Sequence, residues 1–360
     1  MRRAVAATLA AACASACAIG RTERSWPVMG TYARVAVSGG PADARERAIA
    51  IARAAFDEVN ASMSNWSETS ELARVNREAR SGTARVDDAE LAACLAAALD
   101  AAEATGGAFD PTVGPLMTLW GFRPRRPRVP TDEEIERALA HVGSARVVHD
   151  RDARAIRFED AGMELDLGGI AKGCALDLAA ARLRGERGTG LRAITLDLGG
   201  GMMALDGRGA AIGLADPEDA ERGTLATIRL PGDRGVATSS DAENRFESDG
   251  IRYGHLMDAR TGRPAATDVL QATAVHPAGT TSDLLSTALF VAGSRGAAEI
   301  LRRYPGAEAV LIVREGGRLA MIASASLSGR LSLAASARER FTPDSPRFTL
   351  PPATMPAPRP

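Results

Sequence analysis

The stretch Leu165-Asp166-Leu167-Gly168-Gly169-Ile170-Ala171-Lys172-Gly173 is the most informative segment of this 360-residue chain. Its pattern predicts a strand over 163–167, a turn at the two glycines and a helix over 170–184. Glycines at a strand-to-helix turn let backbone N–H groups approach an anion, and a helix N-terminus favours negative charge. Lys172 is the only lysine in the chain and adds a positive charge where a diphosphate would bind. The alternative is a solvated surface lysine.

The sequence on either side predicts long helices separated by short strands. Helices are expected over 42–62, near 72–78, from a cap at Asp87 or Asp88 to about 105, from the capping box at 131–134 to about 141, over 282–292 and near 297–303. Strands are expected at 146–148, 155–158, 193–198, 309–313 and 319–322, and between 210 and 237. This mixture favours an α+β fold over a regular βαβ repeat.

Three further segments carry structural expectations. Residues 109–122 are expected to form a loop punctuated by glycine and proline, and the proline-rich tail over 341–360 is expected to be disordered. The pentapeptide Leu-Asp-Leu-Gly-Gly occurs at 165–169 and again at 196–200. The repeat is either chance or a faded duplication.

The composition is that of a globular protein without a basic surface. Apolar residues make up 45% and charged residues 25%, and the formal net charge is −1. With no excess of basic residues to meet phosphates along a strand, the chain is not expected to bind nucleic acid.

The N-terminus resembles an export signal. Arg2 and Arg3 precede a short apolar run over 4–16, which is too short to span a bilayer as a helix. The run ends at Cys17 in a context typical of a bacterial lipoprotein, which predicts a signal peptide over 1–17 and a lipid anchor on Cys17. Cleavage before Cys13 and an ordinary cleaved signal are the alternatives. Cys94 and Cys174 also remain, but nothing in the sequence brings these two together.

Familiar catalytic motifs are absent from the sequence. It contains no Walker A loop, no Gly-x-Gly-x-x-Gly after a strand, no His-Glu-x-x-His, no Cys-x-x-Cys and no Gly-x-Ser-x-Gly. Chemistry must therefore come from less common arrangements.

Asp283 and Thr287 are the first of these arrangements. They stand four residues apart in Thr281–Thr287, so on a helix they share one face. A carboxylate and a hydroxyl one turn apart make a partial shell for Mg²⁺, which takes few protein oxygens and fills its other positions with water and phosphate. The alternative is an ordinary helix capped by Ser282 or Asp283.

His255 is the second. It stands between an aromatic residue and an acid, just before the Thr-Gly-x-Pro turn at 261–264. Histidine titrates near neutral pH and suits general-base work on a hydroxyl, although a strand histidine is often structural. Two apolar, turn-rich loops over 26–31 and 109–122 are able to wall a flat ring, and ordinary loop packing is equally consistent with them.

In this order, the segments resemble the ApbE family of FAD:protein FMN transferases. The matching stretches cover about residues 25 to 325: Met29-Gly30-Thr31, Ser62-Met63-Ser64 with Ser70-Glu71 and Asn76, 109–122, Leu165–Gly173 with Asp177, Ala237-Thr238-Ser239, 255–264, and Ser282-Asp283 with Thr287. The resemblance implies a two-lobed α+β fold over 18–340 with FAD between the lobes.

The resemblance also implies roles for individual residues. Mg²⁺ would be held by Asp283, Thr287 and the backbone carbonyl of Ala171. Residues expected around FAD are Met29, Glu71, Asp110 and Asp177 near the adenosine half, Lys172 near the diphosphate, and Thr238 and Ser239 on the flavin side. His255 corresponds to the catalytic base, which takes the proton from a Thr or Ser hydroxyl of an acceptor protein. That hydroxyl attacks the phosphorus of the FMN half, and AMP leaves.

Family members are commonly bacterial lipoproteins, so the resemblance implies an exported protein on the periplasmic face of the inner membrane. The chain departs from the family at Ser240, where many relatives have glycine, at Ala242, often tyrosine, at Ala259, usually proline, and at Gly201, often acidic. These differences concern substrate contacts more than metal binding. An FAD pyrophosphatase, a flavin-binding lipoprotein without turnover and a structural envelope lipoprotein are the alternative functions.

Overall fold

The computed structural model describes residues 20–205, 209–219, 222–242 and 244–352. The predicted signal peptide, with Cys13 and Cys17, lies outside the described residues, as does the end of the tail over 353–360.

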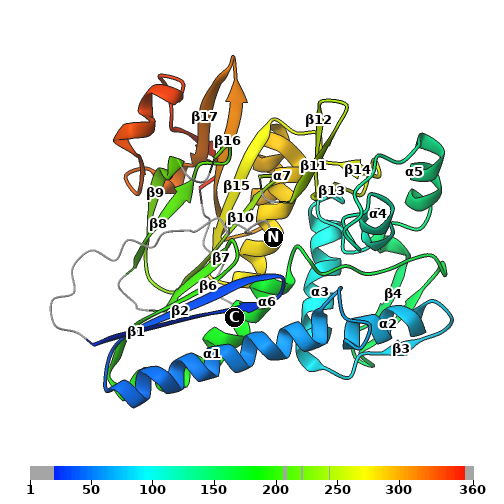
Figure 1. Ribbon diagram of the computed structural model, residues 1–360, viewed down its shortest axis with the longest axis horizontal. Helices are drawn as coiled ribbons and strands as arrows, with labels where there is room; N and C mark the ends of the chain where they lie inside the picture. Colours follow the sequence, from blue (N-terminus) through cyan, green and yellow to red (C-terminus); the bar gives the residue numbers. More distant parts are fainter. Residues whose placement is uncertain (1–19, 206–208, 220–221, 243, 353–360) are drawn as a thin grey trace.

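A nine-stranded sheet runs through the centre of the molecule (Figure 1). In spatial order it contains β1 (Arg21–Val28), β2 (Thr31–Gly39), β6 (Leu191–Leu198), β7 (Gly201–Leu205), β10 (Arg234–Ser240), β15 (Val269–His276), β16 (Glu308–Glu315), β17 (Arg318–Ser324) and β19 (Arg347–Leu350). All neighbours pair antiparallel except β17 and β19, which pair in parallel. Antiparallel neighbours can be joined by short turns, so the chain does not need a helix between every two strands.

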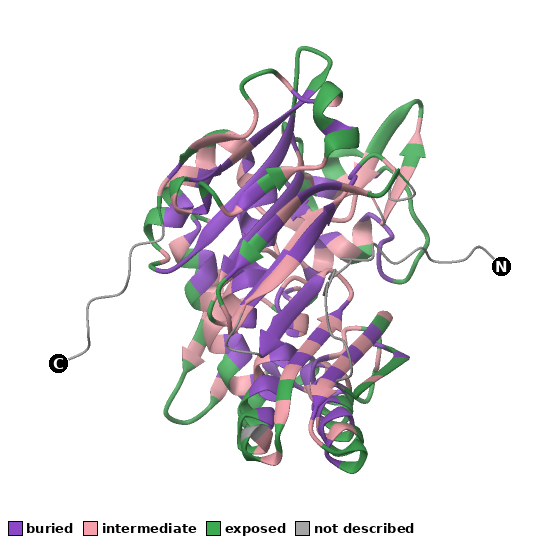
Figure 2. Cartoon of the chain, turned by 90° about the vertical axis from the view of Figure 1, so that its left-hand side faces the viewer, coloured by how far each residue is buried: buried purple, intermediate pink, exposed green. Residues whose placement is uncertain are grey.

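Both faces of this sheet are covered, and Figure 2 shows that its central strands are buried. In β16, Leu311 packs into the core beneath helices α1 (Ala42–Met63), α6 (Ala171–Leu183) and α7 (Gly279–Arg302). Its neighbour Ile312 packs into a second core. That core lies under the small sheet of β8 (Ala210–Ala215), β9 (Thr224–Leu230) and β18 (Leu331–Leu333). Successive side chains of a strand point to opposite faces, so an apolar run such as 309–313 fits a strand buried on both sides.

A third, smaller core stands beside the sheet. It joins α4 (Gly114–Leu119) and α5 (Asp132–Leu139) to the hairpin of β11 (Arg245–Ser248) and β12 (Ile251–Gly254) and to the ribbon of β13 (Met257–Asp258) and β14 (Arg263–Pro264). The remaining elements are α2 (Glu71–Ala79), α3 (Ala89–Ala104), and a sheet of β3 (Ala84–Arg85), β5 (Ala155–Phe158) and β4 (Val147–Asp150). The predicted α+β class is confirmed.

Most helix predictions are confirmed with their caps. Asp88 caps α3 by accepting hydrogen bonds from the amides of Glu90 and Leu91, at 2.8 and 3.0 Å. The capping box of α5 is present, with Thr131 and Glu134 bonded to each other's backbone amides. The two helices expected after residue 282 are present as two segments of α7, joined at Gly293, whose φ of 72° is not helical. The apolar length of α7 would suffice to cross a membrane, but most of the helix is buried inside the protein, as in a core helix.

Three structural predictions are wrong. The expected loop over 109–122 contains α4, because the 3.6-residue pattern of Leu116 and Trp120 buries one helix face despite the flanking glycine and proline. The segment 163–167 is not a strand, since the side chain of Asn76 forms the hydrogen bonds of Leu165 that a strand would form. The tail is ordered to residue 352: Phe341 is buried and β19 extends the main sheet.

The two Leu-Asp-Leu-Gly-Gly copies adopt different structures. In the second copy, β6 runs into a two-residue hairpin turn at Gly199 and Gly200, with φ of 47° and 87°. In the first, the glycines lead into α6. The structure therefore gives no support to a duplication.

Candidate active site

The first turns of α6 and α7 lie in direct contact. The backbone N–H of Gly173 donates a 2.9 Å hydrogen bond to Oδ2 of Asp283, whose side chain is almost completely buried. A Cβ atom on Gly173 would lie 2.5 Å from the carbonyl oxygen of Gly279, so only glycine permits this approach. Asp177 fixes the other side of the contact, because its two carboxylate oxygens accept the amide protons of Gly279 and Thr280 at 2.7 and 2.9 Å.

Thr287 lies one turn after Asp283, as the spacing predicts. A Cβ atom on Gly169 would lie 3.1 Å from Oγ1 of Thr287, which places the glycine turn before α6 against α7. Oγ of Ser239, from β10, lies 2.8 Å from the hydroxyl of Ser286 and 3.4 Å from that of Thr287. Segments far apart in sequence thus bring the hydroxyl groups of Ser239, Ser286 and Thr287 together.

These residues fit a magnesium ion. Asp283 makes one hydrogen bond through its side chain and no ion pair with any Lys or Arg among the described residues. A buried carboxylate so poorly compensated is costly unless a cation joins it. The described part of the chain holds no group of three or more His, Cys, Asp and Glu side chains that could bind a metal ion by themselves. One carboxylate, the Thr287 hydroxyl and the carbonyl of Ala171, which opens α6, make the sparse oxygen set that suits Mg²⁺.

His255 directly follows β12 and is oriented by its neighbours. Its Nδ1 lies 3.2 Å from the carbonyl oxygen of Asn244, which makes Nδ1 the protonated nitrogen and leaves the lone pair on Nε2. The Phe122 ring meets the imidazole edge-on, with centroids 6.5 Å apart. Burial, followed by the charge of Lys172, lowers the pKa of His255 to about 4. The imidazole is therefore neutral at pH 7 and able to accept a proton.

Lys172 and Thr238 each have a local hydrogen-bond partner, and their roles toward FAD stay predictions. Nζ of Lys172 is 3.3 Å from the carbonyl of Gly168 and is partly exposed beside the glycine turn. Oγ1 of Thr238, next to Ser239 on β10, shares a 2.9 Å hydrogen bond with Thr273. Through Ser239, β10 contacts Ser286 and Thr287 of α7.

The residues predicted around adenosine have local structural partners. Met29 occupies a left-handed position, φ 50°, in the two-residue turn between β1 and β2. Glu71 accepts the amide protons of Asp87 and Asp88 through Oε1. Asp110 accepts the hydroxyl and amide protons of Thr112, and its chain neighbour Phe109 lies beside Gly169. Asp177 caps α7, because its carboxylate accepts the amide protons of the first two residues of that helix. Their contacts with FAD stay predictions.

A buried polar network next to the glycine turn is absent from the sequence prediction. Asp166, 8% exposed, accepts hydrogen bonds from Asn65, Arg123 and the amide of Gly168 at 2.6, 3.0 and 2.8 Å. Arg123 also pairs with Glu164. Asp166 within Leu-Asp-Leu-Gly-Gly was the sequence signal for this network. Its partners come from distant segments, so the sequence alone did not reveal them. Trp66, beside Asn65, is 65% exposed and offers a free aromatic face.

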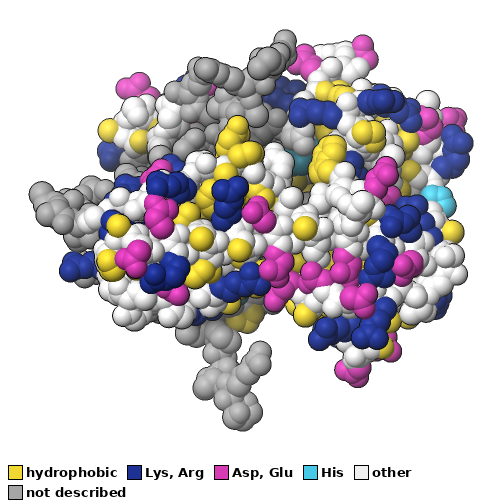
Figure 3. Space-filling model, turned by 60° about the horizontal axis from the view of Figure 1, so that its bottom comes forward, with side chains coloured by type: hydrophobic (Ala, Val, Ile, Leu, Met, Phe, Trp, Pro, Cys, Tyr) yellow, Lys and Arg dark blue, Asp and Glu magenta, His cyan; other side chains and the backbone are white. Residues whose placement is uncertain are grey.

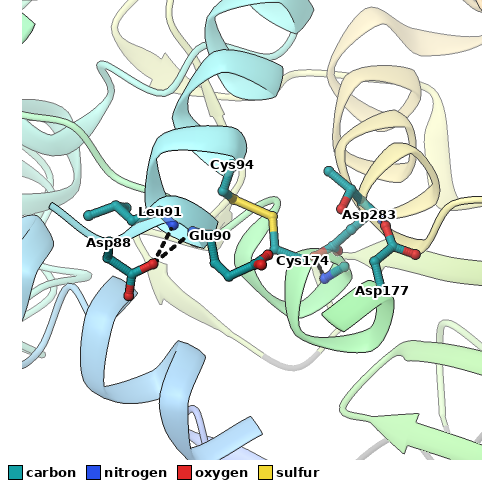
Figure 4. The surroundings of a disulfide bond; sticks show 9 residues. Asp88, Glu90, Leu91, Cys94, Cys174, Asp177 and Asp283 are labelled. Atoms are coloured by element: carbon teal, nitrogen blue, oxygen red, sulfur yellow. Dashed lines mark hydrogen bonds between the residues drawn. A yellow bond between two sulfur atoms is a disulfide. The ribbon is translucent and has the colours of Figure 1, made fainter. Parts of the chain in front are cut away.

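Cys94 and Cys174 form a disulfide, which the sequence did not indicate. The bond joins the middle of α3 to the first turn of α6, with a Cα–Cα distance of 6.3 Å. Figure 4 shows the bond with Asp177 and Asp283 on the far side of the α6 turn. Cys174 is the residue after Gly173, so the cross-link anchors the turn that contacts Asp283.

Two surface features lie outside this site. A cavity of about 250 Å³ beside α3 is lined mainly by alanines with His149 and Arg151, and none of the candidate residues borders it. The face shown in Figure 3 mixes acidic and basic side chains without a large patch of one sign.

Comparison with known proteins gives consistent matches. The family model described as "ApbE family" matches residues 29–311. A Treponema pallidum protein named FAD:protein FMN transferase is 36% identical over 263 residues, covering 68% of this chain and 71% of the relative. A Vibrio cholerae protein of the same name is 35% identical over 277 residues, covering 75% and 80%.

Solved structures agree with the fold. The structure of the Thermotoga maritima ApbE protein superposes with a TM-score of 0.72 at 30% identity, covering 89% of this chain and 99% of that one. The flavin transferase ApbE from Vibrio cholerae superposes with a TM-score of 0.74 at 29% identity, covering 87% and 99%.

Proposed function

This chain belongs to the ApbE family, and we propose that it transfers the FMN half of FAD to a Thr or Ser hydroxyl of an acceptor protein, with Mg²⁺ held at Asp283. The chain is an enzyme of the FAD:protein FMN transferase type. The observation that carries the finer proposal is the convergence of Asp283, Thr287, Lys172 and His255, from three separate segments, on one site.

The metal proposal rests on the contact between α6 and α7. Asp283, Thr287 and the carbonyl of Ala171 would hold the ion, and a bound Mg²⁺ would offset the charge of the FAD diphosphate. Gly173 fixes the Asp283 carboxylate through its amide, and Asp177 fixes the backbone from which α7 starts. These contacts orient the carboxylate before any ligand arrives.

The chemistry of the chain's own residues follows from their positions. Lys172 adds positive charge beside the glycine turn, where it would offset the negative charge of the diphosphate. Nε2 of neutral His255 accepts the proton of the incoming hydroxyl, while the carbonyl of Asn244 holds Nδ1. The hydroxyl oxygen bonds to the phosphorus of the FMN half, the bond to the bridging oxygen breaks, and AMP leaves. The product is a phosphoester between FMN and the acceptor.

The left-handed Met29 and the exposed Trp66 support FAD binding. Backbone strain of this type at a non-glycine residue persists where the surroundings enforce it and is frequent at ligand sites. Trp66 lies next to Asn65, which is bonded to Asp166 at the glycine turn, so an exposed indole stands close to the site. Aromatic faces of this kind stack on planar rings.

We also propose that the protein is exported and lipid-anchored at Cys17 on the periplasmic face of the inner membrane. The sequence of residues 1–17 supports export, and the Cys94–Cys174 disulfide adds independent support. Structural disulfides form mainly in oxidising compartments and are rare in the cytosol.

Incubation of the purified chain with FAD and Mg²⁺, with and without an acceptor domain that carries covalent FMN in its native host, tests the function. AMP release matched by a gain of one FMN in the intact mass of the acceptor is the expected result. AMP with free FMN and an unchanged acceptor mass would identify an FAD pyrophosphatase. Intact FAD in both samples would contradict turnover and indicate a carrier.

A further inference from the structure

A protein substrate must cover the surface around His255. A general base acts within about 3 Å of the proton that it removes, so the acceptor hydroxyl has to reach His255 while the rest of its protein stays outside. Specific interfaces bury roughly 800 Å² on each partner. The exposed residues that border His255 therefore belong to the acceptor interface by necessity, and their chemistry reflects what the acceptor carries.

The segment after Phe122 borders His255 closely. Phe122 contacts the imidazole, and Arg123 pairs with Asp166 at the glycine turn, so the chain is fixed to the site on both sides. The amide of Arg126 then bonds to the carbonyl of Gly121 at 2.8 Å, and that of Arg128 to Trp120 at 3.2 Å. The segment is thus a tightly folded loop.

This loop holds four arginines within residues 123–128. Two of them are neutralised internally: Arg123 by Glu164 and Asp166, and Arg128 by Glu134 at 2.7 and 2.9 Å. Arg125 and Arg126 are exposed, and neither side chain has a hydrogen-bond or ion-pair partner in the described ranges. Arg125 is also close enough to His255 for its charge to act on the imidazole.

The hairpin of β11 and β12 completes the rim, because His255 is the residue after β12. Phe246 stacks on Tyr253, with centroids 5.2 Å apart, and Tyr253 packs at a tilt against Trp120, at 5.4 Å, which fixes the hairpin to the end of α4. Figure 1 shows the hairpin next to α4 and α5. Near its tip, Ile251 is 56% exposed and Arg252 is exposed as well.

We propose that Arg125 and Arg126 form a docking face that binds an acidic segment of the acceptor protein next to the modified hydroxyl. The inference rests on the proposed transferase function. Guanidinium groups bind carboxylates in a planar, bidentate geometry. The docking face belongs to the loop that follows Phe122, which contacts His255, whereas Lys172 lies at the glycine turn.

The test compares Arg125→Glu/Arg126→Glu with Arg229→Glu, which reverses an exposed arginine on β9 in a different core of the molecule. Assays at pH 8 keep His255 neutral in every variant, and the same acceptor domain is used throughout. We expect kcat/KM for the acceptor to fall at least ~10-fold in the double variant, as for reversal of interface charges. Its KM for FAD and its thermal stability should stay at the wild-type values, and Arg229→Glu should match wild type.

A second arm changes the acceptor. Replacing its Asp and Glu residues within about five positions of the modified hydroxyl by Lys should restore transfer by the double variant and impair transfer by wild type. An unchanged kcat/KM for the acceptor in the double variant would overturn the proposal. A rise in KM for FAD in the double variant, as large as the loss of kcat/KM for the acceptor, would also overturn the proposal. It would assign the two arginines to binding of the diphosphate. Failure of the proposed function is distinct, because wild type would then place no FMN on the acceptor.

Discussion

Oδ2 of Asp283 accepts the amide proton of Gly173 at 2.9 Å, which ties the first turn of α7 to the first turn of α6. The contact links the glycine turn and Lys172 to the carboxylate proposed to bind Mg²⁺. Because both partners are buried, a change on either side should be transmitted to the other.

Replacement of Asp283 by Ala should remove Mg²⁺-dependent transfer. We expect kcat/KM to fall at least about 10²-fold while the fold is retained. Mutation of a residue that only orients a metal ligand typically costs about 10- to 100-fold in metal affinity or activity, and loss of the ligand itself should cost more. Asp283→Asn keeps an acceptor for the Gly173 amide and serves as the matched control for structure. Circular dichroism and titration of activity with Mg²⁺ measure the two effects. Full activity of Asp283→Ala at the wild-type Mg²⁺ requirement would refute the metal assignment.

His255→Ala should slow transfer by roughly 10²–10⁴-fold and leave FAD bound, as expected for loss of a general base. The pKa of His255 is lowered to about 4, so the neutral, active form predominates above that pH. Wild-type kcat/KM for FAD should therefore fall as the pH drops through about 4, rather than near 6.5. The folded state binds this proton less readily than the unfolded state, so the free energy of unfolding should also decrease between pH 6.5 and 4. A midpoint near 6.5 would contradict the lowered pKa of the partly buried imidazole.

Gly173→Ala should separate α6 from α7. Its Cβ would meet the backbone of Gly279 at 2.5 Å, and overpacking of this kind costs about 1–3 kcal/mol. The displaced amide should also raise the Mg²⁺ concentration needed for half-maximal transfer. Gly185→Ala is the control, since nothing lies within 4 Å of its added Cβ. Equal stability and equal Mg²⁺ requirement in both variants would show that the close approach is unimportant.

Asp177→Ala tests whether this residue acts on α7 or on FAD. Removal of a cap costs about 0.5–2 kcal/mol, and α7 carries Asp283, so thermal stability and Mg²⁺ affinity should both fall. KM for FAD measured at saturating Mg²⁺ should change little. A rise in that KM at unchanged melting temperature would instead support the adenosine role predicted from the family.

Loss of the Cys94–Cys174 disulfide should destabilise the protein by about 2–4 kcal/mol, because the bond closes a long loop in the unfolded chain. Cys94→Ser/Cys174→Ser and chemically reduced wild type should show the same decrease in melting temperature. Reduction should have no effect on the double variant. An unchanged melting temperature in reduced wild type would mean that the bond contributes nothing to stability.

The sequence by itself determined the local structure and the family. Helical spacing located α1, and the capping signals at Asp88 and Thr131 fixed where α3 and α5 begin, because a cap satisfies amides within its own turn. Asp283 and Thr287 were predicted to share a helix face from their spacing alone, and they do. The order and spacing of such motifs were sufficient to predict the ApbE family, and the match to the family model confirms this prediction.

Only the tertiary structure decided which distant residues meet. The pairing of Cys94 with Cys174, the burial of Asp166 between Asn65 and Arg123, and the capping of α7 by Asp177 all join segments that no local pattern connects. Tertiary packing also overrode local signals where Asn76 replaced a predicted strand at Leu165. The physical reason is that side-chain hydrogen bonds and burial depend on contacts between elements, whereas spacing and caps report only on the element in which they lie.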